Sequence, residues 1–181
     1  NVVTGDADAA PAIGGTLTGD ARVRKLSFTG STQVGRLLMA QSAPSLKRLS
    51  LELGGNAPFI VFEDADLDAA VDGAIASKYR NSGQVCVSAN RILVQQNVMD
   101  AFADKLTAKV QALKVGHGFE NNVQIGPLID ASGLAKVQSL VADAVSKGAT
   151  VLTGGKPDVR GGLYFQPTVI KGVTADMRMK H

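Results

Sequence analysis

The chain has 181 residues, of which 45% are apolar and 19% are charged, and this composition excludes disordered, collagen-like and coiled-coil chains. Its net charge of +3, from 19 Lys and Arg against 16 Asp and Glu, is too small to predict a nucleic-acid partner. No apolar run reaches the roughly 18 to 20 residues that span a bilayer, so we expect a cytoplasmic protein with no membrane partner.

Metal chemistry is not expected. The chain has one cysteine, Cys86, and two histidines, His117 and His181. A single thiol forms no internal disulfide, and one cysteine with two distant histidines does not make a zinc ligand set. We therefore expect no metal site.

Short apolar runs alternate with segments of helical periodicity, which predicts an α/β fold with a mostly parallel sheet flanked by helices. The spacing predicts helices over residues 33–41, 66–82, 98–113 and 130–147, with Asp66 and Asp130 placed to cap two of them. It predicts one sheet of about six strands, over residues 24–28, 49–53, 58–62, 91–95, 150–152 and 165–170. Residues 58–62 are continuously apolar, which predicts a central strand covered on both faces.

The sequence FTGST at residues 28–32 ends a predicted strand in a glycine turn and begins a predicted helix. Free backbone N–H groups at such a helix start bind anions, so Gly30 and Ser31 are candidates for a phosphate site. The alternative is that Ser31 or Thr32 is an ordinary N-cap.

A carboxylate, Glu52, follows an apolar strand and precedes Gly54 and Gly55. The glycines permit close approach of a ligand, and a carboxylate in apolar surroundings has the character of a general base. The alternative is a glutamate that faces solvent before a glycine turn.

The only thiol lies in the sequence RNSGQVCV at residues 80–87, just past a predicted helix end. A thiolate is a strong nucleophile, and a loop position lets a carbonyl substrate reach it. The alternative is a buried cysteine, because free cysteines are mostly buried and Cys86 is flanked by valines.

Taken together, the motifs FTGSTQVG, LELGGNAPFIVFEDADLDAA, YRNSGQVCVSANR, IGPLID and FQPTV closely resemble the aldehyde dehydrogenase superfamily, and most of all its succinate-semialdehyde branch. The resemblance covers essentially the whole chain. It implies the three-layer, Rossmann-like α/β architecture of that superfamily, with residues 1–53 ending a cofactor-binding domain and residues 54–181 beginning a catalytic domain. Because members of the family are longer, it also implies that the chain is a segment of a larger protein.

The resemblance assigns roles to individual residues. Cys86 corresponds to the nucleophile and Glu52 to the residue that activates water. For the cofactor, NAD or NADP, Gly30 and Ser31 correspond to contacts with the pyrophosphate, Val34 to a position near the adenine and Leu53 to one beside the nicotinamide. Arg80 corresponds to the residue that holds a substrate carboxylate, a task that suits a bidentate guanidinium. The alternative for Arg80 is an arginine that only meets a helix dipole.

The implied function is oxidation of a small aldehyde to its acid, with succinate semialdehyde as the expected substrate. Glutarate semialdehyde or another small aldehyde is the alternative. A second alternative is an inactive domain with structural contacts only. The resemblance also implies a homo-oligomer in which the helix over residues 33–41 takes part, although that helix could equally pack only on its own sheet.

Overall fold

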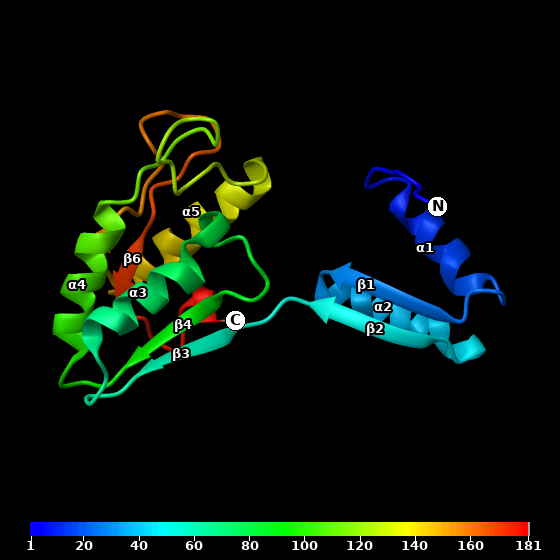
Figure 1. The fold of residues 1–181 in the computed structure, drawn as a ribbon, viewed down its shortest axis with the longest axis horizontal. Helices are drawn as coiled ribbons and strands as arrows, with labels where there is room; N and C mark the ends of the chain where they lie inside the picture. Colours follow the sequence, from blue (N-terminus) through cyan, green and yellow to red (C-terminus); the bar gives the residue numbers. More distant parts are fainter. Residues whose placement is uncertain (181) are drawn as a thin grey trace. The chain divides into compact units, whose positions relative to one another are not determined.

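The structure, a computed structural model, describes residues 1–180 (Figure 1). These residues divide into two compact units, one up to Gly55 and the other from Asn56 onward. The assignment of the first unit to cofactor binding and of the second to catalysis stays a prediction. Within the described residues, no helix combines the length and the apolar character that crossing a membrane requires.

The first unit contains a β-α-β element. Strand β1 (Lys25–Gly30) and strand β2 (Arg48–Leu53) pair in parallel, and helix α2 (Thr32–Ser42) connects them together with the short 3₁₀ turn η1 (Ala43–Ser45). Helix α2 packs on one face of the strand pair (Figure 1), where Leu38 is buried. This arrangement confirms the predicted helix and the two predicted strands.

The sequence did not predict helix α1 (Ala10–Gly19). Its ten residues include three glycines, which are poor helix formers, and they lack a clear apolar stripe. Pro11 stands in its first turn, a position where proline favours a helix start. The helix is held by tertiary contacts with α2, among them a hydrogen bond of 3.3 Å between the Thr18 hydroxyl and the Gln41 side chain.

The second unit begins with the parallel pair β3 (Ala57–Val61) and β4 (Ala89–Val94). Helix α3 (Leu67–Lys78) and the short 3₁₀ segment η2 (Arg80–Gly83) connect the two strands, and α4 (Met99–Gln111) packs beside α3 (Figure 1). The Asp66 carboxylate accepts hydrogen bonds from two backbone N–H groups of α3, which confirms the predicted cap. One core cluster of this unit consists of Val61, Val71, Ala74, Phe102, Leu106, Val110 and Val169, and a second one consists of Ala144, Ala149 and Met177.

The final elements are α5 (Ala131–Ser146), β5 (Thr150–Thr153), β6 (Val169–Lys171) and the 3₁₀ turn η3 (Arg178–Lys180). The Asp130 carboxylate caps α5 as predicted, by accepting from the N–H of Gly133 at 2.7 Å. Strands β5 and β6 are antiparallel. A parallel pair needs a crossover connection, usually a helix, between its strands. The stretch between β5 and β6 contains no helix, which is consistent with their antiparallel pairing.

Three sequence expectations about the strands are wrong. The six strands do not form one sheet, because the described residues form three two-stranded sheets. The last strand begins at Val169 rather than at residue 165, since Pro167 has no backbone N–H for a ladder. Strand β3 is not covered on both faces: Val61 is buried, but Ile60 is 56% exposed and Phe62, just past the strand, is 61% exposed.

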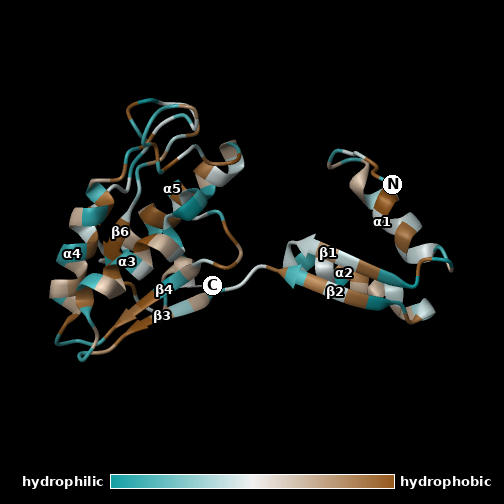
Figure 2. Ribbon diagram, viewed as in Figure 1, coloured by the Kyte–Doolittle hydropathy of each residue, from teal (hydrophilic) through white to brown (hydrophobic). Residues whose placement is uncertain are grey.

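Figure 2 shows hydrophobic residues toward the carboxyl ends of β3 and β4, yet α3 and α4 supply contacts to one face only. A continuous apolar run therefore did not distinguish a strand covered on both faces from one covered on a single face. Helix α5 gives a smaller correction of the same kind. The periodicity of residues 130–147 predicts both Ala144 and Val145 on the core face; Ala144 is buried as predicted, but Val145 is 49% exposed.

Candidate functional site

The first group of predicted site residues lies where the parallel strands β1 and β2 end. The strand register places Gly30 beside Leu53 and Thr29 beside Glu52. Because the carboxyl ends of parallel strands meet at one edge of a sheet, this edge collects the residues that follow each strand. Glu52 and the four predicted cofactor residues, Gly30, Ser31, Val34 and Leu53, thus come from neighbouring positions of one β-α-β element.

Helix α2 begins at this edge. Ser31 is its N-cap, and the Ser31 hydroxyl accepts a hydrogen bond from the N–H of Val34 at 3.2 Å, so the ordinary capping role is present. The N–H groups of Thr32 and Gln33 make no hydrogen bond to any described residue, and both residues are exposed. Two free N–H groups at the positive end of an 11-residue helix make this end able to accept an anion.

Two glycines, Gly30 and Gly35, allow close packing of neighbouring side chains at this edge. A Cβ on Gly30 would lie 2.4 Å from the ring of Phe28, and a Cβ on Gly35 would lie 2.8 Å from a methyl group of Leu53. Real Cβ atoms do not approach other atoms so closely. Gly30 therefore leaves room for the Phe28 ring, and Gly35 lets α2 pack directly on Leu53.

The Glu52 side chain is exposed at the end of β2. Its carboxylate makes no hydrogen bond or ion pair with any described residue. The space beside Gly54, two residues further on, is open, because no atom lies within 4 Å of a Cβ built there. A carboxylate without a protein partner at an open strand end is available to a water molecule or a ligand.

The second group belongs to the connection between α3 and β4. Cys86 is exposed, which excludes the alternative of a buried cysteine. The chain turns from Val85 to Ser88, where the N–H and the hydroxyl of Ser88 both donate to the Val85 carbonyl, at 3.2 and 2.8 Å. Cys86 and Val87 occupy the two central positions of this turn, so the thiol is presented outward, as a nucleophile requires.

Arg80 lies in η2, six positions before Cys86, and is exposed. Its guanidinium makes no hydrogen bond or ion pair within residues 1–180. An unpaired guanidinium is free to take a carboxylate in bidentate geometry. Two residues earlier, burial lowers the pKa of Lys78, whose ammonium donates to the Asn90 side chain at 2.8 Å.

Tyr79, at the end of α3, packs against the core of the second unit. Burial raises the pKa of its hydroxyl, which donates to the carbonyl of Thr168 at 2.9 Å. The neutral hydroxyl thus joins the end of α3 to the segment before β6.

The sequence did not single out Ser82 and Gln84. Both side chains hydrogen-bond to the 126–129 segment, some 44 residues further along the chain. Their polar character between Arg80 and Cys86 was the only available signal, because pairing at such a separation is not encoded in local spacing.

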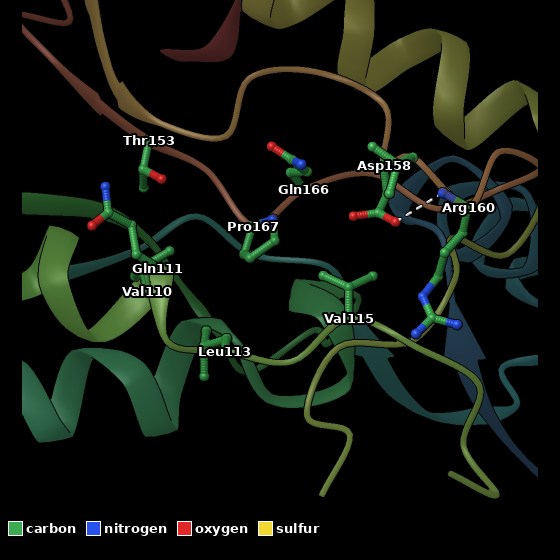
Figure 3. Close-up of a pocket in the computed structure, with 10 residues that line it drawn as sticks. Val110, Gln111, Leu113, Val115, Thr153, Asp158, Arg160, Gln166 and Pro167 are labelled. Carbon is green, nitrogen blue, oxygen red and sulfur yellow. Dashed lines mark hydrogen bonds between the residues drawn. The ribbon is translucent and has the colours of Figure 1, made fainter.

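A cavity of about 330 Å³ lies elsewhere in the second unit (Figure 3). It contains none of the predicted site residues and is lined by Val110, Gln111, Leu113, Val115, Thr153, Asp158, Val159, Arg160, Gln166 and Pro167. Its one guanidinium, that of Arg160, already pairs with both carboxylate oxygens of Glu120, at 2.9 and 3.2 Å. The other charged residue in the lining, Asp158, accepts a hydrogen bond from the backbone N–H of Arg160 at 3.0 Å, so the lining offers a ligand no unpaired cation.

Comparison with known proteins places these features in context. Residues 1–181 match the aldehyde dehydrogenase family. The chain is 60% identical over 173 residues to glutarate-semialdehyde dehydrogenase of Pseudomonas aeruginosa, covering 96% of this chain and 35% of that protein. It is 58% identical over 179 residues to the NADP(+) succinate-semialdehyde dehydrogenase GabD of Escherichia coli, covering 99% and 36%.

Solved structures agree with this match. Succinate-semialdehyde dehydrogenase from Burkholderia pseudomallei superposes with a TM-score of 0.94 at 61% identity, covering 98% of this chain and 36% of that one. Betaine aldehyde dehydrogenase from Staphylococcus aureus, in complex with NAD+, superposes with a TM-score of 0.84 at 38% identity, covering 92% and 34%. The chain thus spans about a third of the length of these relatives. With its α/β fold, its exposed thiol in a turn and a family match along its whole length, the chain belongs to the aldehyde dehydrogenase family.

Proposed function

We propose that the protein carrying this chain oxidises an aldehyde to a carboxylic acid with NAD or NADP, with Cys86 as the nucleophile. The observation that carries the proposal is the outward presentation of the only thiol of the chain at the centre of the Val85–Ser88 turn. Relatives whose names state aldehyde dehydrogenase activity support it.

The chemistry begins at Cys86. Its thiolate adds to the aldehyde carbon and forms a C–S bond, and we expect the backbone N–H of Cys86 to donate a hydrogen bond to the resulting oxyanion. Loss of hydride from that carbon leaves a thioester on Cys86. Glu52 takes a proton from water, which attacks the thioester, and the acid leaves as the thiol is restored. When bound, the nicotinamide ring supplies the hydride acceptor.

The first unit fits the cofactor. The free N–H groups of Thr32 and Gln33 are available to donate hydrogen bonds to a pyrophosphate, which we propose binds at Gly30 and Ser31. Val34 is 40% exposed and leaves an apolar surface for the adenine. Leu53, packed on Gly35, gives a firm apolar contact for the nicotinamide side. The choice between NAD and NADP rests on the ribose contacts, which these residues do not include.

We propose that the substrate is an aldehyde with an acidic group at its far end, succinate semialdehyde first and glutarate semialdehyde second. The unpaired Arg80 guanidinium supplies the matching charge. The names of similar relatives point the same way, since they include succinate-semialdehyde, glutarate-semialdehyde and 3-sulfolactaldehyde dehydrogenases.

The two-step chemistry is tested with Glu52→Gln. This variant should form the thioester and then stall, because no base activates the water. Rapid mixing should show a burst of one reduced cofactor per active site, and intact mass spectrometry should find the acyl group on the Cys86 peptide. Cys86→Ser is the control and should show neither. Steady turnover of Glu52→Gln at the wild-type rate would contradict the role of Glu52.

The substrate assignment is tested with Arg80→Ala. We expect KM for succinate semialdehyde to rise far more than KM for a neutral aldehyde of similar length. Arg91→Ala is a suitable control, because Arg91 is also exposed but its guanidinium already donates to the Asn56 carbonyl. Equal effects of Arg80→Ala on both aldehydes would remove Arg80 from substrate recognition.

We also propose that the complete protein is a homo-oligomer that uses α2. Leu37 and Met39 of this helix are each 54% exposed, while Leu38 packs inward. Exposed apolar side chains on one helix favour burial against a second copy. Sedimentation of wild type and Leu37→Glu tests this: a charge at the interface should shift the protein towards monomer, and an unchanged assembly would exclude α2 from it.

A further inference from the structure

The backbone before Cys86 has an uncommon conformation. Asn81, Ser82 and Gly83 follow one another with φ values of 51°, 57° and 75°. Glycine adopts such angles freely, but Asn and especially Ser do so at a cost. Three consecutive residues in the left-handed region therefore need contacts elsewhere to hold them.

Two side chains supply these contacts. The Ser82 hydroxyl donates to the Gly126 carbonyl at 3.1 Å and accepts from the Gly126 N–H at 3.0 Å. The Gln84 amide donates to the Pro127 carbonyl at 3.3 Å and accepts from the N–H of Ile129 at 2.9 Å. Four hydrogen bonds thus join Ser82 and Gln84 to the 126–129 segment, and we call this set the 82/84 clamp.

The chain is also fixed on the other side of the thiol. Ser88 and Ala89 are buried, and the Ala89 N–H donates to the Ser77 hydroxyl at 3.1 Å, where β4 begins. Between the clamp and β4 only the Val85–Ser88 turn remains, with Cys86 near its centre. Two anchors therefore flank the thiol: the 82/84 clamp before it in the chain and the Ala89–Ser77 hydrogen bond after it.

We propose that Ser82 and Gln84 are positioning residues for the nucleophile: the 82/84 clamp holds the left-handed backbone and thereby fixes the Cys86 thiol for attack on the aldehyde. This inference rests on the proposed function, because it deepens the role of Cys86. It assigns to the 126–129 segment the role of a support for the backbone before Cys86.

The variants are Ser82→Gly and Gln84→Met. Ser82→Gly removes both hydrogen bonds to Gly126 while it relieves the left-handed strain, so a loss of folding is not the expected result. Gln84→Met keeps the size of the side chain and removes both of its hydrogen bonds. Ser139→Ala is the control, because it also removes a serine hydroxyl that accepts a long-range hydrogen bond, from Arg178 at 2.7 Å, but on α5.

Three readouts are made on the intact protein. Amide hydrogen exchange should become faster at Gly126 in Ser82→Gly and at Ile129 in Gln84→Met. In aldehyde oxidation, kcat should fall about 10- to 100-fold, since small misplacements of reacting groups cost this much, with KM for the aldehyde nearly unchanged. The alkylation rate of Cys86 by iodoacetamide, read on its peptide, should move from the wild-type value towards that of the unfolded protein.

The outcomes separate the two hypotheses. Faster exchange at Gly126 and Ile129 with kcat and alkylation unchanged from Ser139→Ala would overturn the positioning role and leave the proposed function standing. A wild-type thiol that alkylates at the unfolded rate would overturn it as well. A wild type that oxidises no aldehyde would overturn the proposed function. In that case, alkylation rates that still shift in both clamp variants would support the positioning of the thiol.

Discussion

Replacing Gly35 by alanine tests the contact between α2 and the end of β2. The added Cβ would lie 2.8 and 3.1 Å from the two methyl groups of Leu53, so the Leu53 side chain has to move. Overpacking of this kind costs about 1–3 kcal/mol. Alanine is a better helix former than glycine by about 1 kcal/mol. The net expectation is therefore a loss of stability of about 0–2 kcal/mol in the first unit.

A double-mutant cycle separates the two contributions. In a Leu53→Ala background the clash is gone, and Gly35→Ala should then stabilise the first unit by about 1 kcal/mol. Gly15→Ala is the matched control, because Gly15 lies in helix α1 with no atom within 4 Å of a built Cβ, and it should stabilise in either background. The free energy of opening of β1 and β2, from amide hydrogen exchange, is the quantity to measure.

The test of the contact is whether the effect of Gly35→Ala on stability differs between the wild-type and Leu53→Ala backgrounds. Stabilisation by the same amount with and without Leu53 would show that α2 does not press on this side chain, and the apolar support proposed for the nicotinamide would be lost with it. A coupling of about 1–3 kcal/mol between the two positions would confirm the contact.

Three further predictions concern stability. Phe102→Ala, at a core position only 2% exposed, should lower the free energy of unfolding of the second unit by about 3–5 kcal/mol in urea denaturation, and a loss below about 1 kcal/mol would contradict the core assignment. Gly154→Ala should destabilise more than Gly148→Ala: both glycines have positive φ, but only at Gly154 would a Cβ meet a backbone atom, 2.3 Å from the Pro167 carbonyl oxygen. Hydrogen bonds to the Asp143 carboxylate, first from the Arg178 N–H and second from the Lys147 ammonium, hold the pKa of Asp143 below its usual range. The charged carboxylate therefore stabilises the fold fully at pH values above the unfolded-state pKa of about 3.9, and this stabilisation is lost as pH falls through the lower folded-state pKa. Urea midpoints of wild type and Asp143→Asn should therefore differ at neutral pH and converge in acid, and a constant difference across pH would contradict this role.

Much of the local structure could be predicted from the sequence because it depends on neighbouring residues. Asp66 and Asp130 stand where a helix needs an acceptor for its first N–H groups, and both cap as expected. Gly30 at the end of β1 and Ser31 after it indicated where α2 begins. The placement of Cys86 outside regular structure followed from the glycine that ends the α3 region, although its exposure required the structure.

The pairing of strands and the covering of their faces were decided by tertiary structure. The apolar run 58–62 had the same pattern whether one or both faces were covered, and only the positions of α3 and α4 show that Ile60 lies on the open side. Helix α1 forms from a glycine-rich segment because α2 is there to pack against it. No local rule contains such contacts, since each depends on a partner distant in sequence.

The site shows the same division. The sequence by itself determined which residues carry reactive groups, namely the thiol of Cys86, the carboxylate of Glu52 and the guanidinium of Arg80, because reactivity is a property of the side chain. Only the tertiary structure showed that Ser82 and Gln84 reach the 126–129 segment. The physical reason is that a strained backbone next to a nucleophile is held by hydrogen bonds across 44 residues of chain, and such bonds exist only once both segments have folded against each other.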